Sequence, residues 1–123
     1  MRTILAVVFA VGLGLGAASA SAEDAVVKTV AALHQDKAAL AGKLVRVKGK
    51  VVKVNNGIMG RNFLHVQDGT GDQTSNDLTV TSKQTAAVGD QVTVTGRVVV
   101  NRDFGAGYAY PLLVEEASIT ATK

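Results

Sequence analysis

An alternation of apolar and polar side chains with a period of two begins at Lys43 and dominates the rest of this 123-residue chain. Side chains of a strand point alternately to opposite faces, so this pattern predicts strands with one buried face. The pattern occupies five segments, residues 43–54, 62–67, 78–82, 91–100 and 108–120. Five short strands separated by turn residues predict an all-β, five-stranded antiparallel Greek-key barrel, because closure removes exposed edges.

Glycine and asparagine punctuate these strands. The sequence Asn55-Asn56-Gly57 predicts a tight turn between the first two strands, and residues 68–72 predict the next turn. Gly49 and Gly96 lie inside otherwise regular strand patterns, where glycine indicates a bulge. Pro111 lies near the start of the last strand, where an edge position tolerates it.

The second strand carries the candidate binding face. Phe63, His65 and Gln67 alternate with Leu64 and Val66, so we expect one set outside and the other in the core. The segment from residue 43 to residue 61 holds six basic residues and no acidic one. An aromatic platform beside basic side chains is typical of single-stranded nucleic-acid binding. The predicted ligand-binding face comprises Arg46, Lys48, Lys50, Arg61, Phe63, His65, Tyr108 and Tyr110. The alternatives are a solvated basic strand beside a half-buried phenylalanine, and tyrosines that cover an open end of the barrel.

The first 22 residues predict a secretory signal peptide. A basic start precedes an apolar run that is too short and glycine-rich for a membrane span, and Ala20-Ser21-Ala22 is a cleavage motif of small residues. Cleavage after Ala20 and a retained anchor are the alternatives. Residues 23–123 would then reside in the periplasm with 12 basic and 10 acidic residues, a net charge of +2. The chain has no cysteine, so packing alone has to hold this exported domain together.

Residues 23–42 form the one helical candidate outside this leader. Val26, Val30 and Leu33 fit one helical face, and Glu23 lies at the N-terminal end, where an acidic residue favours a helix. We expect the helix to falter near Asp36 and to end by Gly42. The barrel then occupies residues 43–123.

Neither a metal site nor a catalytic site emerges from the sequence. Met59, His65 and His34 could offer thioether and imidazole ligands to copper(I), but three ligands make a sparse set. Glu115 and Glu116 are adjacent and therefore face opposite sides of a strand. Gly69-Thr70-Gly71 lacks the lysine and the helix of a phosphate-binding P-loop. We expect a binding protein without a cofactor, not an enzyme.

Two longer runs carry a family resemblance. The run Phe63-Leu64-His65-Val66-Gln67-Asp68-Gly69-Thr70-Gly71, followed by V-G-D-x-V-x-V-x-G at residues 88–96, resembles the OB-fold anticodon-binding barrels of class II aminoacyl-tRNA synthetases. That resemblance implies that Phe63 lies on the ligand face and stacks on a base. Residues 54–62 and 103–111 are similar to exported bacterial OB-fold proteins related to NrfJ, which are commonly described as DNA-binding.

The resemblance implies two partners. One is single-stranded nucleic acid, bound on the basic and aromatic face. The other is a periplasmic protein of the c-type cytochrome and nitrite reductase systems, because NrfJ takes its name from that association. Nucleic-acid binding should weaken steeply with salt, whereas a protein interface built on Phe63 and Tyr108 should depend on buried apolar area.

Overall fold

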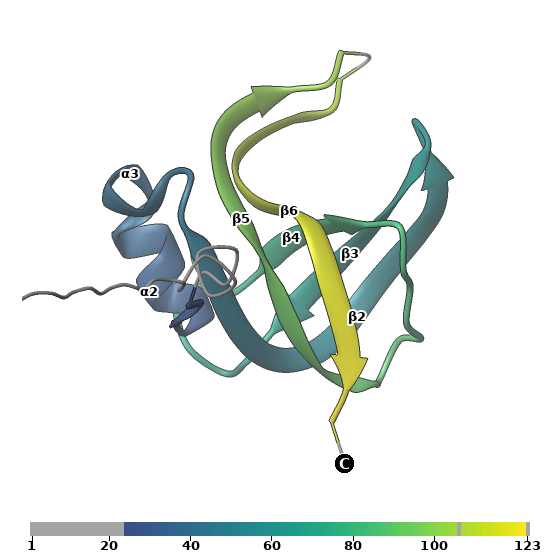
Figure 1. Ribbon diagram of the computed structural model, residues 1–123, viewed down its shortest axis with the longest axis horizontal. Coiled ribbons are helices and arrows are strands. Elements are labelled where there is room, and N and C mark those ends of the chain that lie inside the picture. The colour runs from purple at the N-terminus through teal and green to yellow at the C-terminus, as the bar shows by residue number, and fades with distance from the viewer. Residues whose placement is uncertain (1–23, 106, 123) are drawn as a thin grey trace, which may run out of the picture.

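Five strands form a closed ring in the computed structural model, which describes residues 24–105 and 107–122 (Figure 1). These strands are β2 (Leu44–Ile58), β3 (Arg61–Gln67), β4 (Leu78–Ser82), β5 (Gln91–Asp103) and β6 (Ala109–Ala121). Their order in the sheet is β2-β3-β4-β6-β5, and β5 pairs back to β2. The result is an OB-like all-β fold, as the period-two pattern predicts.

The sheet differs from the prediction in two respects. It has six strands, because the two-residue strand β1 (Val26–Val27) pairs in parallel with β2. It is also mixed, because β4 and β6 run parallel where Val80 meets Val114. The second difference follows from closure: β5 is antiparallel to β2 and β6 is antiparallel to β5, so β6 must run in the direction of β4.

The interior of the ring is filled by the inward side chains of these strands. Val47, Val51, Leu64, Val80 and Val94 are all at most 1% exposed and belong to one apolar cluster. Burial of a valine or leucine side chain stabilises the fold by about 1.5–3 kcal/mol. The apolar cluster therefore stabilises this cysteine-free chain by packing alone.

Two short helices pack beside the ring (Figure 1). Helix α2 spans Val30–Gln35 and helix α3 spans Lys37–Leu40, with Asp36 between them. The interruption at Asp36 matches the expected position, and α3 ends at Leu40, before Gly42, whose φ is +81°, as expected. The start of the helix differs from the prediction, because residues 26–27 pair with β2. The helix begins after Thr29, whose side chain accepts a hydrogen bond from Ala32 N–H.

The first hairpin is longer than predicted. Strand β2 continues through the sequence Asn55-Asn56-Gly57, and the chain reverses at Met59 and Gly60, whose φ angles are 52° and 78°. Two residues with positive φ define the type I′ turn that suits a two-residue hairpin. The predicted turn segment instead forms an irregularity in the β2–β3 register between Asn55 and Ile58. The predicted turn at Asn55-Asn56-Gly57 is therefore wrong, because these residues form a bulge within β2.

The two strand glycines have different roles. At Gly49 the pairing of β2 with β5 is regular, and a Cβ there would lie 2.5 Å from Val66 Cγ1, so this glycine permits a close approach. Near Gly96 the β5–β6 register shifts, as predicted, but the extra residue is on β6, where Glu116 has a φ of 52°.

Within the described residues, no helix is long and apolar enough to cross a membrane. The predicted signal peptide, residues 1–22, lies outside the described part of the chain.

Candidate functional site

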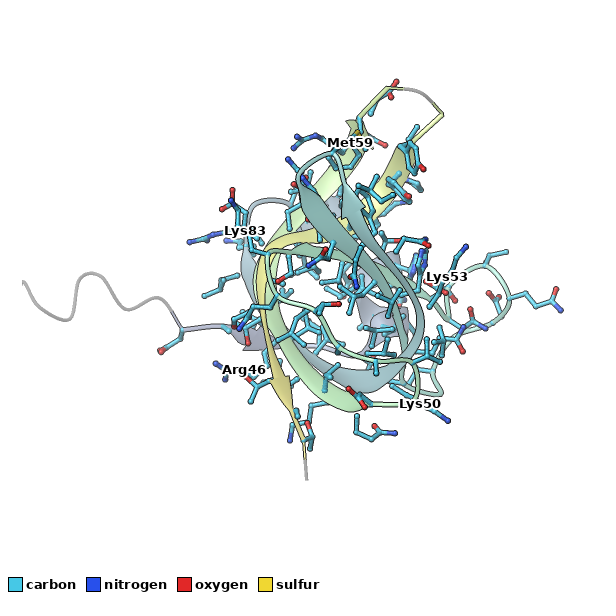
Figure 2. The ribbon with its side chains drawn as sticks, turned by 90° about the vertical axis from the view of Figure 1, so that its right-hand side faces the viewer. Arg46, Lys50, Lys53, Met59 and Lys83 are labelled. Carbon is cyan, nitrogen blue, oxygen red and sulfur yellow. The ribbon has the colours of Figure 1, made fainter. Side chains whose placement is uncertain are left out.

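Four basic side chains line the outer face of β2, and we call them the basic stripe: Arg46, Lys48, Lys50 and Lys53. All four are exposed. Arg46 donates a hydrogen bond from Nε to Thr95 Oγ1 at 3.3 Å. The three lysines form no hydrogen bond or ion pair with any described residue. Because β2 curls around the ring, Arg46 lies on one side and Lys50 and Lys53 lie on the other (Figure 2).

An open groove of about 480 Å³ adjoins the middle of the stripe. Its walls come from β2, from the end of β3 and the following turn, and from the start of β5. Lys48, Lys50, Gln67, Asp68 and Gln91 supply its polar side chains. The stripe therefore offers ammonium groups without ion-pair partners beside a hollow surface that carries two amide side chains and the Asp68 carboxylate.

Phe63 lies on the outer face of β3, as the alternation predicts, because it pairs with Asn55 and Thr81 and is not part of the interior cluster. It is nevertheless only 2% exposed. The β5–β6 hairpin covers it with three aromatic side chains. The centroid of the Phe63 ring lies 5.5 Å from that of Phe104, 5.9 Å from that of Tyr110 and 6.1 Å from that of Tyr108. We call these four residues the aromatic clasp. The ring of Phe63 is thus not available to stack on a base in this conformation.

An ion-pair network borders the aromatic clasp. Glu115, 6% exposed, accepts a hydrogen bond from Arg61 Nη1 at 3.1 Å and one from Arg102 Nη1 at 2.9 Å. Both guanidinium groups also lie over the Phe104 ring, at 5.1 and 4.6 Å from its centroid. Arg61 and Arg102 come from different hairpins, so the network ties the two hairpins together.

Tyr108 and Tyr110 differ within the clasp. Tyr108 is 37% exposed, whereas Tyr110 is half-buried. Burial, with a smaller contribution from the neighbouring Tyr108, raises the pKa of the Tyr110 phenol above its usual value of 10.0.

The two histidines meet at one aspartate. His65 Nδ1 lies 2.8 Å from Asp77 Oδ1, and His34 Nε2 lies 2.7 Å from the Asp77 carbonyl oxygen. These contacts link α2, β3 and the loop before β4. Met59 lies at the tip of the β2–β3 hairpin (Figure 2). No group of three His, Cys, Asp or Glu side chains suited to a metal ion occurs among residues 24–105 and 107–122.

The turn after β3 caps a helix. Asp68 Oδ2 accepts a hydrogen bond from Val30 N–H at 2.9 Å, and Thr70 Oγ1 accepts one from Ala31 N–H at 3.0 Å. Burial acts to raise the pKa of Asp68, but hydrogen bonds from Thr70 and from the Val30 N–H outweigh it and hold the pKa below the usual value of 3.8. The D-G-T-G sequence thus anchors α2 to the ring.

The predicted binding face is divided among three places. Arg46, Lys48 and Lys50 form the stripe; Arg61, Phe63, Tyr108 and Tyr110 belong to the clasp and its ion pairs; His65 contacts Asp77. Sequence reasoning did not identify Phe104, Arg102 or Glu115 as members of a site. The available signal was Glu115 itself, a carboxylate directly after the apolar run 112–114, because a buried carboxylate requires cationic partners.

Comparison with solved structures supports the fold. The chain is similar to asparaginyl-tRNA synthetase from Entamoeba histolytica, in complex with asparaginyl-adenylate, with a TM-score of 0.52 and 16% identity over 81% of this chain. It is also similar to a putative aspartyl-tRNA synthetase from Leishmania major Friedlin, with a TM-score of 0.53 and 14% identity over 83% of this chain. The chain spans 25% and 22% of those two proteins, respectively.

No protein-family model matches the sequence, and no curated protein matches it significantly. The predicted likeness to aminoacyl-tRNA synthetases is therefore confirmed as a likeness of fold. It defines an OB-like domain; at these identities it carries no activity with it.

Proposed function

We propose that this protein is a non-catalytic binding module that holds single-stranded nucleic acid along the basic stripe. The observation that carries this proposal is the set of three lysines on β2 whose side chains have no partner among the described residues, two of which, Lys48 and Lys50, border an open groove. Lysines spaced along a strand match the repeated phosphates of an extended chain. The neighbours in fold are tRNA synthetases by name, which adds support from proteins that act on a nucleic acid.

The burial of Phe63 changes the expected binding mode. Base stacking on Phe63 would require the β5–β6 hairpin to move away, so the stripe has to supply most of the affinity through phosphate contacts. Such binding is tolerant of sequence and strongly dependent on salt. We also propose export to the periplasm, as the first 22 residues predict.

The test is fluorescence anisotropy of a labelled single-stranded oligonucleotide titrated with the purified protein. Salt is varied between about 50 and 200 mM. The double variant Lys48→Gln/Lys50→Gln should bind more weakly and reduce the slope of log K against log salt by about 1.4, since each phosphate contact on a single strand contributes about 0.7. Lys37→Gln on α3 is the control and removes one charge instead of two. A loss of binding free energy in this control that is half the loss in the double variant would show a response to net charge alone and would refute a site on β2.

A second candidate function is docking on a periplasmic protein. Met59 and Tyr108, at the ends of the two hairpins, are 44% and 37% exposed, and methionine, tyrosine and arginine are enriched at interface cores. We propose a cytochrome c nitrite reductase as the partner, on the basis of the resemblance to NrfJ-related proteins. Titration calorimetry with that purified enzyme should detect binding that resists salt and that the double variant Met59→Ser/Tyr108→Ala abolishes. Binding that this variant retains would exclude the hairpin tips.

A further inference from the structure

A cleft of about 220 Å³ lies between the β2–β3 hairpin and the bulged part of β6, separate from the basic stripe. The end of β4 and strand β5 complete its walls. Its charged side chains are Arg61, Lys83, Arg102, Glu115 and Glu116, and Thr81 and Ser82 contribute hydroxyl groups. The groups that line it belong to four strands or their ends, so only the folded ring assembles this cleft.

The charges in this cleft are not equivalent. Glu115 is buried, and one nitrogen of each arginine occupies one of its two oxygens. This three-residue network carries a net charge of +1. Lys83 is exposed on the rim, and its ammonium group has no partner in the described chain, so it adds a second positive charge. Glu116 is also exposed and opposes them from the bulge.

The two arginines are held in position before any ligand arrives. Each uses a single Nη1 atom for Glu115 and lies over Phe104, and their side chains remain 31% and 42% exposed. A guanidinium group has five N–H donors in a rigid plane, so donors remain for an anion. Because the side chains are already ordered, binding costs little additional conformational entropy.

We propose that this cleft binds the phosphate group of a small ligand. Oxyanions with several acceptor oxygens match converging guanidinium donors, and phosphate accepts such charge-assisted bonds strongly. The volume lies below the range of about 300–1,000 Å³ typical of pockets for whole small molecules, so the cleft fits the anionic group and leaves the remainder of the ligand outside. This site is independent of nucleic-acid binding on the stripe.

The test is an NMR titration of the purified protein with inorganic phosphate at constant ionic strength, following the arginine Nε–H signals and the backbone amides. We expect saturable shifts at Arg61, Lys83 and Arg102. A nucleoside 5′-monophosphate, compared with the same nucleoside lacking phosphate, then distinguishes a phosphoester ligand from the free ion. Shifts centred on β2, or shifts that do not saturate, would overturn the proposal.

Variants that remove a positive or a negative charge at the rim of the cleft should change phosphate affinity in opposite directions. Lys83→Gln should weaken phosphate binding about threefold, and Glu116→Gln should strengthen it by a similar factor, since both side chains are exposed charges at the rim. Arg102→Lys should weaken binding about tenfold because it keeps the charge but loses the planar donor set. Lys37→Gln, on α3, should leave the affinity unchanged. A Lys37→Gln loss equal to that of Lys83→Gln would refute a site in this cleft, and dispersed amide spectra verify that each variant is folded.

Discussion

The aromatic clasp and the basic stripe both lie on the outside of the ring, and both consist of residue types that bind nucleic acid. Their surroundings differ. Phe63 in the clasp is covered by three rings of the β5–β6 hairpin, and the adjoining arginines share one carboxylate. The lysines of the stripe have no partner within the described chain. Residue type therefore indicates a possible ligand, but the contacts already made within the fold decide whether a side chain is free to bind one.

The largest expected effect is loss of stability in Phe63→Ala. A phenylalanine that is 2% exposed leaves a cavity beneath the hairpin when it is truncated, so the free energy of unfolding should fall by about 3–5 kcal/mol. Urea denaturation followed by circular dichroism measures this change. Tyr108→Ala, in the same clasp but 37% exposed, is the control and should cost about 1 kcal/mol. A loss below 1 kcal/mol for Phe63→Ala would show that the clasp opens in solution.

The ion-pair network provides the next effect. Glu115→Gln removes the charge that two arginines share, and it should lower the free energy of unfolding by about 1–3 kcal/mol, less than a fully buried pair because both arginines are partly exposed. Arg102→Gln should cost less, since Glu115 retains Arg61. Thermal and urea denaturation of both variants test this order. The reverse order would indicate that Arg102 contributes mainly through its contact with Phe104.

Asp68 links stability to pH. Asp68→Ala removes the acceptor for Val30 N–H and should cost about 1 kcal/mol at neutral pH. The folded pKa of Asp68 lies below its unfolded value, so the stabilisation is complete above about pH 3.8 and is lost as the pH falls through the folded pKa. Denaturation curves of wild type and variant should therefore differ at neutral pH and converge at acidic pH. A difference that persists at low pH would contradict the assigned carboxylate bond.

The smallest effect is expected in the stripe. Lys50→Gln and Lys53→Gln change exposed side chains without partners among the described residues, so the free energy of unfolding should change by no more than about 0.5 kcal/mol. The same denaturation assay measures it. A larger loss would mean that the stripe has a structural role, which would remove the contrast with the clasp.

Much of the fold follows from local pattern. The alternation along residues 62–67 correctly places Phe63 outside and Leu64 and Val66 inside, because side-chain direction in a strand depends only on the backbone period. The strands β2 to β6 are predicted on the same basis. The two-residue strand β1 is not, since Val26 and Val27 fit a helical face equally well and only pairing with Val45 and Arg46 decides.

The solvent exposure of individual side chains could not be predicted from the sequence. Phe63 is covered by Phe104, Tyr108 and Tyr110, which lie 41 to 47 residues later in the chain, and no residue near Phe63 in the sequence indicates this contact. Adjacent glutamates were expected to face opposite sides of a regular strand, but the strand bulges at Glu116 and both side chains line the same cleft, with Glu115 buried between two arginines and Glu116 exposed. Such long-range contacts depend on ring closure and cannot be deduced from spacing.

The most direct test of this account is the affinity of Phe63→Leu for a single-stranded oligonucleotide, measured by fluorescence anisotropy at fixed salt. Leucine retains an apolar side chain beneath the hairpin but lacks a ring to stack on a base. We expect this variant to bind with the affinity of the wild type, because Phe63 is covered and the stripe supplies the contacts. A loss of about 1–3 kcal/mol in binding free energy in a folded variant, the usual contribution of base stacking, would show that the hairpin opens and that Phe63 is the platform after all.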